Sequence, residues 1–556
     1  MDIKQLLTET IAKAAREAMA AGAFRADELP PVMLEVPPQK EFGDYATNFA
    51  MQAARAAKTN PRVIAQAIVD RIQAPWLEKA VIAGPGFINF YLKPGWLYDL
   101  LQRILAAGEN YGNTDYGRGR RVQVEFVSAN PTGPLHVGHG RGAAVGSALV
   151  NLLRAAGYDV EAEFYINDAG SQIDHLAASV NARYLELLGQ PVEFPEDGYR
   201  GRDIIDTAQR IIDREGARYL LVSPAERLAV FKELALSEKL AALREDLEAF
   251  GVTFDVWFSE RTLHQTGAIA ATCELLKKSG DIYEQDGALW LRSTAYGDDK
   301  DRVVIRDNGV PTYLAADIAY HRNKFERGFD TVINIWGADH HGYIARVKAA
   351  IAALGYDPAR LEVLILQMVS LYQNGELVKM SKRTGQGVTL AELIEEVGRD
   401  AARFFFIMRS ADSQLDFDLD LAKSRTNENP VYYIQYAHAR IASIFRQAEE
   451  AGIAVRPEEW TEDKLACLTA ETEIDLIKKL GEYPDEITAA ARERAPHRIA
   501  RYVHDLAGLF HAFYNQCRII GVEPALQNAR LGLVTAVQRV LRHALSILGV
   551  TAPEKM

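Results

Sequence analysis

Two histidines, His136 and His139, lie three positions apart in a loop rich in Gly and Pro. The loop follows a short apolar run and precedes a long helical pattern. Both imidazoles are therefore expected at a helix N-terminus, where free N–H groups and the helix dipole attract phosphate. Gly138 between them has no side chain that would hold a nucleotide away from the backbone. Alone, such a pair is more often an ordinary helix cap, but the preceding buried strand favours a phosphate-binding site.

A basic loop, KMSKR at 379–383, lies far downstream and is followed by glycines. Lys379 and Lys382 stand three apart. On a mobile loop they can close over a triphosphate and neutralise the charge that develops as pyrophosphate leaves. A solvated basic loop is the commoner meaning of such a run in isolation. Together with the two upstream histidines, the loop predicts ATP chemistry.

Buried-strand patterns lie before and between these two motifs. The stretch after the histidines, from 141 to 158, is strongly helical, and Gly157 is a plausible C-cap. A strand, a Gly/Pro loop and a helix in this order open a Rossmann-like unit, and the further strands favour a largely parallel α/β sheet. The predicted strands are residues 121–127, 160–166, 331–337 and 361–369.

Periodicity and turn signals divide the chain into several segments. The first part combines a helical pattern, Pro-rich and Gly-rich turns and an alternating strand pattern, which is typical of a small α+β domain. From about residue 390 onward the pattern is nearly all helical. We therefore expect an N-terminal α+β domain at 1–110, a Rossmann-like domain at 111–390 with a helical insertion at about 172–278, a connecting segment at 391–430 and a helical domain at 431–556.

The composition excludes several classes of protein. The 556 residues carry a formal net charge of −12, so general affinity for polyanions is not expected. The 48% hydrophobic and 25% charged residues are typical of a soluble globular protein, and we expect neither a membrane nor DNA as a partner. The three cysteines form neither a zinc nor a disulfide pattern. An acidic N-terminus without an apolar segment predicts a cytoplasmic protein.

Taken together, these motifs resemble the class I aminoacyl-tRNA synthetases, and most closely the arginyl-tRNA synthetase family. HVGH is similar to the HIGH-type motif of that class, and KMSKR is similar to its KMSKS-type motif, although Arg383 replaces the usual Ser. EFGDYATN and GPGFINFYL resemble the family's N-terminal tRNA-binding domain, so the similarity spans essentially the whole chain. The other segments that carry it are VEFVSANPTGPLHVGHGR (124–141), YINDAGSQ (165–172), FDVWFSE (254–260), PTYLAADIAYH (311–321), WGADHHGY (336–343) and NPVYYIQYAHARI (429–441).

The resemblance implies an enzyme with a two-step reaction that uses ATP with Mg²⁺ and no covalent enzyme nucleophile. The carboxylate of L-arginine would attack the α-phosphate to give arginyl-adenylate and pyrophosphate, and the 2′-OH of the terminal ribose of tRNA(Arg) would then take the arginyl group. The expected catalytic residues are the two histidines for the pentavalent phosphate and the two lysines for the leaving pyrophosphate. The expected ATP-binding residues are His136, Gly138, His139, Lys379, Met380, Ser381 and Lys382.

A pocket for a guanidinium ion needs planar acceptors, ideally a carboxylate that accepts two parallel N–H bonds. Tyr313 and Asp317 are four apart in a helical pattern and would share one face. Glu125 ends a predicted strand, and Asn130 lies in the loop that follows it, so both would face the crevice beyond the strands. Each of these residues is ordinary by itself. The resemblance implies that all four contact arginine.

The segment WGADHH contains Asp339, His340 and His341 in a row. Adjacent side chains rarely ligate one ion together, and no further ligand stands at a suitable spacing, so we expect no bound metal here. The resemblance implies instead that Asp339 and His340 line the arginine and ATP pocket.

Aromatic and basic residues near the start of the helical domain are candidates for contact with tRNA. Single-stranded anticodon bases are usually read by stacking on aromatic side chains and by hydrogen bonds to base edges. Tyr432, Tyr436 and Arg440 stand at helical spacing, and we expect them to bind tRNA, although core packing is the ordinary role of such tyrosines. The resemblance further implies a monomer that needs bound tRNA before it activates arginine.

Two other classes of protein fit part of the pattern. A related adenylyltransferase that activates another acid without tRNA would have no evident use for the flanking domains. Among synthetases, the glutamyl and cysteinyl enzymes would need a basic pocket or paired cysteines. An inactive tRNA-binding scaffold would be marked by loss of the motif histidines or lysines, and all four are present.

Overall fold

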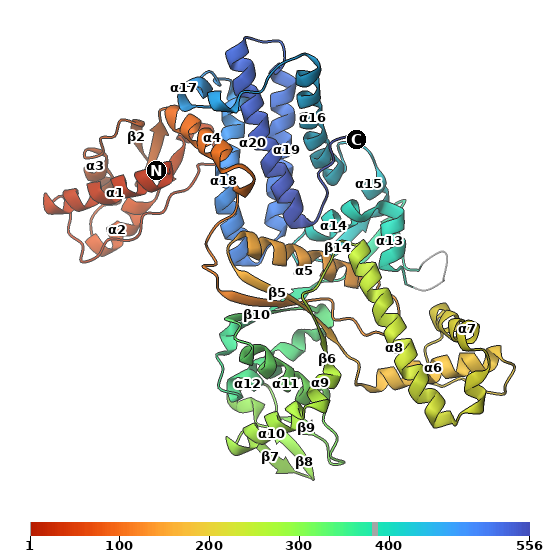
Figure 1. Cartoon of the computed structure of the whole chain (residues 1–556). Coiled ribbons are helices and arrows are strands. Elements are labelled where there is room, and N and C mark those ends of the chain that lie inside the picture. Colours follow the sequence, from red (N-terminus) through yellow and green to blue (C-terminus); the bar gives the residue numbers. More distant parts are fainter. Residues whose placement is uncertain (1, 381–386) are drawn as a thin grey trace. The chain divides into compact units, whose positions relative to one another are not determined.

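The computed structural model describes residues 2–380 and 387–556 (Figure 1). These residues divide into two compact units. The first unit contains Met1–Glu109, Ile444–Gly481 and Leu509–Arg539, and the second contains Asn110–Ser443, Glu482–Gly508 and Val540–Met556.

The first unit contains a three-stranded antiparallel sheet in the order β1-β3-β2. Ile88 and Phe90 of β3 are fully buried, and Leu7 and Ile11 of α1 reach the same core through their helical spacing. This arrangement is the α+β fold expected for the N-terminal part of the chain. Its elements are α1 (Ile3–Ala20), β1 (Tyr45–Thr47), α2 (Phe49–Ala57), α3 (Pro61–Val69), β2 (Leu77–Ala83), β3 (Phe87–Leu92), α4 (Gly95–Ala107) and α17 (Glu462–Leu465).

A five-stranded parallel sheet in the order β11-β10-β4-β5-β6 forms the centre of the second unit and confirms the expected α/β fold. Val122 and Val124 in β4 have no exposed surface, because α5 covers one face of the sheet and α11 covers the other (Figure 1). These elements are β4 (Arg121–Glu125), α5 (Val137–Ala155), β5 (Asp159–Ile166), β6 (Val256–Ser259), α11 (Tyr313–Glu326), β10 (Thr331–Gly337), α12 (Ile344–Ala353) and β11 (Leu361–Leu366).

The strand order reverses at β4. From this strand the chain runs outward through β5 to β6, and it later returns to β10 on the opposite side of β4. In open α/β sheets, ligands bind beyond the carboxyl ends of the strands at such a reversal point. The carboxyl end of β4, which is Glu125, therefore marks the place where a site is expected.

The insertion between β5 and β6 is helical and shorter than the expected range of 172–278. Its helices α6 (Ser171–Leu187), α7 (Arg202–Glu215) and α8 (Pro224–Ala249) share a small core around Tyr184 and Phe231. The next segment, Val256–Ser259, is a strand of the central sheet rather than part of the insertion. It has only four residues, which are all half-buried at the sheet edge, so it lacks the long apolar run that marks a central strand.

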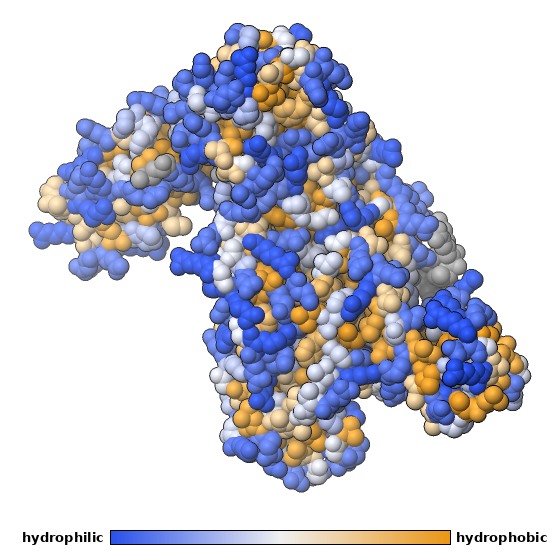
Figure 2. Space-filling view, in the orientation of Figure 1, coloured by the Kyte–Doolittle hydropathy of each residue, from blue (hydrophilic) through white to orange (hydrophobic). Residues whose placement is uncertain are grey.

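Exposed apolar side chains gather on this insertion, as Figure 2 shows for one face of the molecule. Leu221 is 90% exposed and Leu187 is 43% exposed.

After β6 the chain forms a short antiparallel sheet before it enters α11. These elements are α9 (Glu260–Gln265), α10 (Ala268–Lys278), β7 (Ile282–Gln285), β8 (Ala288–Leu291) and β9 (Arg302–Ile305).

A third small sheet, in the order β13-β12-β14, carries the basic loop. Asn374 (φ 52°) and Gly375 (φ 75°) form the tight turn between β12 and β13, where both positions need a positive φ. The KMSKR segment begins directly after this hairpin. The elements here are β12 (Val369–Gln373), β13 (Glu376–Val378), α13 (Leu390–Val397), α14 (Arg399–Ile407), β14 (Leu415–Asp418) and α15 (Leu419–Lys423).

The other α-helices of the described residues are four long ones, as expected from the apolar stripes in the sequence. Of the residues that the structure describes, one helix, α20, is long and apolar enough by length and composition to cross a membrane. However, 67% of that apolar window is buried in the structure, as in a core helix. The four helices are α16 (Pro430–Glu450), α18 (Glu471–Glu493), α19 (His497–Gln516) and α20 (Pro524–Leu548).

Candidate active site

The two motif histidines stack at the N-terminus of α5, where the sequence predicted them. Their ring centroids are 3.7 Å apart and the planes differ by 27°. His136 is the N-cap, and its Nδ1 accepts from the Gly138 N–H at 3.2 Å, while His139 Nδ1 accepts from the His136 N–H at 3.3 Å. Because Nδ1 accepts in both rings, a neutral imidazole must carry its proton on Nε2. The pair therefore presents two Nε2–H donors.

Both histidines are held in the neutral state. Burial lowers the pKa of His136, and burial together with the neighbouring His136 lowers the pKa of His139 to about 4. A side chain at Gly138 would crowd the pair, since its Cβ would lie 3.1 Å from His136 Cε1. The site can thus donate hydrogen bonds to a phosphate oxygen without depending on an imidazolium charge.

The segment that follows the basic loop is anchored close to this histidine pair. Lys379 and Met380 follow β13 and are exposed, with Met380 at 62%. Ser381, Lys382 and Arg383 lie outside the described residues. On the far side of the loop, the Leu390 N–H donates to the Leu135 carbonyl at 2.8 Å, and Thr389 and His136 form a β-bridge.

Arg141 fixes α5 against the segment that follows β11. Its side chain is 1% exposed, and its guanidinium donates to the carbonyls of Gln367 at 2.7 Å, Ser413 at 2.9 Å and Ser410 at 2.9 Å. This residue stands two positions after the histidine motif and was not singled out from the sequence. Its contacts hold in place the helix that carries the two histidines.

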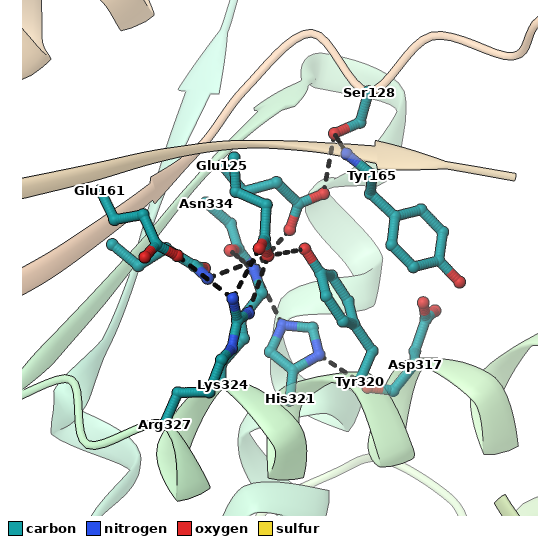
Figure 3. Close-up of polar contacts among 12 residues, drawn as sticks. Glu125, Ser128, Glu161, Tyr165, Asp317, Tyr320, His321, Lys324, Arg327 and Asn334 are labelled. Carbon is teal, nitrogen blue, oxygen red and sulfur yellow. Dashed lines mark hydrogen bonds and ion pairs between the residues drawn. The ribbon is translucent and has the colours of Figure 1, made fainter. Parts of the chain in front are cut away.

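Glu125 lies at the carboxyl end of β4 and is 8% exposed. Its Oε2 accepts from Lys324 Nζ at 2.5 Å, and its Oε1 accepts from Ser128 Oγ at 2.9 Å (Figure 3). Each oxygen of this predicted arginine ligand therefore has one donor within the protein, and its charge is balanced by a lysine.

Asp317 lies on α11 and points toward the same region from below the sheet (Figure 3). Its Oδ2 accepts from the Tyr343 hydroxyl at 2.7 Å. Burial raises the pKa of Asp317 to about 7, with further increases from the nearby Glu125 and Glu260 carboxylates, while the Tyr343 bond lowers it. A carboxylate in such an acidic and buried place favours a cationic ligand.

Glu260 is a further candidate site residue, which was not expected from the sequence. It begins α9 directly after β6, is 5% exposed, and accepts from the Tyr165 hydroxyl at 2.7 Å. Its other oxygen is 3.4 Å from His264 Nε2. The available signal was its position in FDVWFSE, where an acidic residue directly follows an aromatic strand.

A fourth buried carboxylate, Glu163 of β5, is fully paired. Arg327 donates to its two oxygens at 2.7 and 2.9 Å, and the Tyr320 hydroxyl contacts it as well. Among the described residues, Glu125 and Glu163 thus have buried or half-buried cations, whereas Asp317 and Glu260 receive tyrosine hydroxyls. These last two carboxylates are the ones whose charge a bound cation can balance.

The other predicted arginine ligands lie at the surface of this region. Tyr313 begins α11 and is 55% exposed. Its ring lies close to Gly170, where an added Cβ would be 3.8 Å from the ring. Asn130 is exposed in the loop after β4. Asp339 and His340 have side chains that are 79% and 60% exposed, and they contact each other at 3.1 Å. In the part of the chain that the structure describes, no group of three His, Cys, Asp or Glu side chains could hold a metal ion.

The predicted tRNA-binding residues share one face of α16. The Tyr432 and Tyr436 rings stack with centroids 6.0 Å apart and planes 11° apart. Arg440 lies 4.6 Å above the Tyr436 ring and donates to its hydroxyl at 3.0 Å. The three side chains are half-buried, so each keeps some surface open to a partner.

Three family models match the chain. They are the arginyl-tRNA synthetase N-terminal domain at residues 1–92, the class I (R) tRNA synthetase catalytic domain at 100–418 and the DALR anticodon-binding domain at 434–556. The catalytic match includes the histidine pair and the carboxylates Glu125, Glu260 and Asp317, and it covers more than half of the chain. The fold and the site therefore define a class I aminoacyl-tRNA synthetase. Within that class, the chain belongs to the arginyl-tRNA synthetase family.

Individual relatives agree with this assignment. The arginine–tRNA ligase of Carboxydothermus hydrogenoformans is 55% identical over 555 residues, covering 100% of this chain and 99% of that protein. The arginine–tRNA ligase of Heliobacterium modesticaldum is 55% identical over 557 residues with the same coverage. The structure of Thermus thermophilus arginyl-tRNA synthetase has a TM-score of 0.75 and 25% identity, covering 100% of both chains. The expected family and fold class are confirmed.

Proposed function

We propose that this protein is an arginine–tRNA ligase that activates L-arginine with ATP and then esterifies tRNA(Arg). The observation that carries this proposal is the pair of carboxylates Asp317 and Glu260. Among the residues that the structure describes, they have no cationic partner within hydrogen-bond range other than the weakly placed His264. They lie at the carboxyl ends of the sheet whose first helix carries the histidine pair. The 55% identity to arginine–tRNA ligases over the full chain supports the same activity.

The guanidinium of arginine would be bound by Asp317 and Glu260. Each of these carboxylates has one oxygen held by a tyrosine hydroxyl, so the other oxygen can accept an N–H from a planar guanidinium. Tyr313, one turn before Asp317, would cover the guanidinium. Glu125 would meet a different part of the amino acid, because Lys324 already balances its charge.

The remaining predicted ligands stand closer to the solvent. Asn130 follows the end of β4, and Asp339 and His340 follow the end of β10, the neighbouring strand. Side chains beyond the carboxyl ends of adjacent parallel strands face one crevice. We assign these three residues to the polar, reacting end of arginine and the adjoining ATP.

In the first step, a carboxylate oxygen of arginine attacks the α-phosphorus, the bond to the β-phosphate oxygen breaks, and pyrophosphate leaves with that electron pair. The ATP enters with its own Mg²⁺, which neutralises part of the phosphate charge. His136 and His139 would donate from Nε2 to the phosphorus-bound oxygens, and Lys379 and Lys382 would stabilise the departing pyrophosphate. Positioning and these hydrogen bonds supply the rate, since no covalent intermediate with the enzyme is formed.

In the second step, the 2′-OH of the terminal ribose attacks the carbonyl carbon of arginyl-adenylate and AMP leaves. The tRNA would be positioned in part by Tyr432 and Tyr436, whose half-buried rings can stack on bases, and by the neighbouring Arg440. We assign the protein to the cytoplasm as a monomer, in which each chain carries a complete site.

The test is the exchange of labelled pyrophosphate into ATP. We expect exchange that requires both arginine and tRNA and that falls by about 10²–10³ in Lys382→Ala, which removes one charge-stabilising contact. Lys278→Ala, at an exposed lysine of α10, is the matched control and should match the unaltered protein. Exchange with another amino acid would overturn the arginine assignment, and its complete absence would indicate a binding protein without catalytic activity.

A further inference from the structure

A chain of buried hydrogen bonds joins the two acidic sides of the arginine pocket. Lys324 Nζ contacts Glu125 Oε2 at 2.5 Å and Asn334 Oδ1 at 2.9 Å, and Asn334 Nδ2 contacts His321 Nε2 at 2.8 Å (Figure 3). His321 Nδ1 is 2.7 Å from the main-chain carbonyl of Asp317. The chain therefore runs from the end of β4 to the helical turn that carries Asp317.

The chemistry of the groups fixes the direction of every bond. A lysine ammonium only donates, so the Asn334 oxygen must accept and its amide nitrogen must donate to His321 Nε2. The His321 proton is then on Nδ1 and is donated to the Asp317 carbonyl. Burial, followed by the nearby Lys324 charge, lowers the pKa of His321 to about 3, so this ring stays neutral.

The members of this chain are almost completely buried. Lys324 and Asn334 have no exposed surface, His321 is 3% exposed, and the Lys324 ammonium lies 4.4 Å from the Tyr320 ring centroid. Glu125 and Asn334 are also direct neighbours in the register of β4 and β10. Packing therefore keeps the Lys324 side chain away from solvent and paired with Glu125.

The backbone beside Glu125 places a second hydrogen-bond donor, Ser128, against its carboxylate. Val127 (φ 67°) and Ser128 (φ 43°) are both left-handed, a conformation that is unfavourable for a β-branched residue. It turns Ser128 Oγ so that it donates to Glu125 Oε1 at 2.9 Å and accepts from the Tyr165 N–H at 3.1 Å. Each oxygen of Glu125 thus has its own donor, and the carboxylate has one orientation.

Lys324 also acts on the carboxylate opposite. Its charge lowers the pKa of Asp317, against the increases caused by burial and by Glu125. An ion pair with a purely structural role would involve only Lys324 and Glu125. Here the lysine also acts on Asp317, so it links both predicted arginine ligands at the point where the strand order reverses.

We propose that Lys324 is a positioning residue for arginine binding, which orients Glu125 in the pocket, balances its charge and ties the Asp317 turn of α11 to the sheet. This inference rests on the proposed function, since it assigns a role within the same arginine site. It predicts that Lys324 affects the binding of arginine and not the binding of ATP.

The first test compares Lys324→Gln with the unaltered protein in tRNA aminoacylation, with separate measurement of the KM values for arginine and ATP. We expect the arginine KM to rise about tenfold or more and the ATP KM to change less than about twofold. Glu125 would then be buried without a cation, beside Asp317 and Tyr320 of α11 and Tyr165 of β5.

Conservative and compensating variants separate positioning from folding. Lys324→Arg keeps the charge, so it should recover part of the arginine affinity. The double variant Glu125→Gln/Lys324→Gln has no buried charge to compensate, so its Tm should exceed that of Lys324→Gln, while its arginine KM should equal that of Glu125→Gln.

A matched control is the buried lysine of the insertion, Lys239, which is 6% exposed and contacts Asp203 at 2.6 Å. Lys239→Gln should lower the Tm as Lys324→Gln does, but it should leave the arginine KM unchanged. An unchanged arginine KM in Lys324→Gln, or equal increases for arginine and ATP, would overturn the proposal while the proposed function stands. If the unaltered protein does not arginylate tRNA at all, the proposed function fails and this role fails with it.

Discussion

The Tyr343 hydroxyl donates to Asp317 Oδ2 over 2.7 Å, from the segment after β10 to the helix α11. A second tyrosine, Tyr165, makes the equivalent bond to Glu260, also at 2.7 Å. Each of the two carboxylates that we assign to the guanidinium is therefore held by one neutral donor. The donors fix the direction of the carboxylates without cancelling their charge.

The affinity for arginine should depend on pH around neutrality. The pKa of Asp317 is raised to about 7, so its carboxylate is ionised mainly above that pH, whereas the guanidinium is cationic throughout. Arginine affinity should therefore increase as pH rises through 7, and below it each pH unit should weaken binding by up to about tenfold. Calorimetry in two buffers of different ionisation enthalpy should detect proton release on binding near pH 7. A binding enthalpy that is independent of the buffer would contradict this prediction.

Tyr343→Phe should weaken arginine binding and shift its pH dependence. The phenol lowers the pKa of Asp317, so its removal should move the increase in affinity to higher pH. A hydrogen bond to a charged group contributes about 1.5–3 kcal/mol, which corresponds to a loss of roughly 10- to 150-fold at pH 7. Tyr356→Phe is the control, because this ring packs on Phe325 in the neighbouring core. Equal arginine KM values in the two variants would speak against the role of Tyr343.

Glu260→Gln should narrow the discrimination between arginine and its neutral isostere citrulline. The variant keeps the shape of the side chain and an acceptor oxygen but removes the charge that complements a guanidinium. We expect the arginine KM to rise by roughly tenfold or more, while inhibition by citrulline should change little. Competition assays measure the ratio of the affinities for arginine and citrulline. If this ratio is the same in Glu260→Gln and in the unaltered protein, the guanidinium does not bind at Glu260.

The histidine pair should act as neutral donors. His139→Ala should lower kcat by about 10²–10³, as does removal of one donor to a developing charge. His139→Gln should retain more activity, because its amide N–H can replace Nε2–H. The low pKa of about 4 for His139 predicts no change in kcat between pH 6 and pH 8 that can be traced to this ring. A titration near pH 6.5 that vanishes in His139→Gln would show that a charged imidazolium is required.

Tyr436→Ala should weaken the binding of tRNA and leave the binding of arginine unchanged. It removes the ring that stacks on Tyr432 and supports Arg440. Base stacking on an aromatic side chain contributes about 1–3 kcal/mol, so the KM for tRNA should rise roughly 5- to 150-fold. The arginine KM in the same assay is the internal control. A tRNA KM equal to that of the unaltered protein would restrict this tyrosine to packing.

The local features of the fold were predictable from the sequence. The apolar strands, the helix after the histidines and the Asn374-Gly375 turn each have a signal within a few neighbouring residues, and the structure contains them. The edge strand β6 was missed, since four half-buried residues have no strong periodicity. Long-range partners were missed for a different reason. Lys324 and Glu125 are 199 positions apart, and only the packing of α11 on the sheet brings them together.

The same limit applies to the candidate site. Asp317 and the histidines could be proposed from motifs, but the donors that set their protonation come from elements remote in sequence, such as Tyr343 for Asp317. Glu260 and Arg141 stood inside recognised motifs without a pattern that gave them a role. Their functions depend on burial and hydrogen-bond partners, which a single sequence does not reveal.

The most direct test is the formation of arginyl-tRNA by the unaltered protein and by Asp317→Asn at pH 7.5. We predict that the unaltered protein charges tRNA with arginine. For the variant we predict an arginine KM at least about tenfold higher, because half of the charge that complements the guanidinium is lost, together with an ATP KM close to that of the unaltered protein. A protein that forms no arginyl-tRNA, or a variant with an unchanged arginine KM, would contradict the assignment of this acidic pocket to arginine.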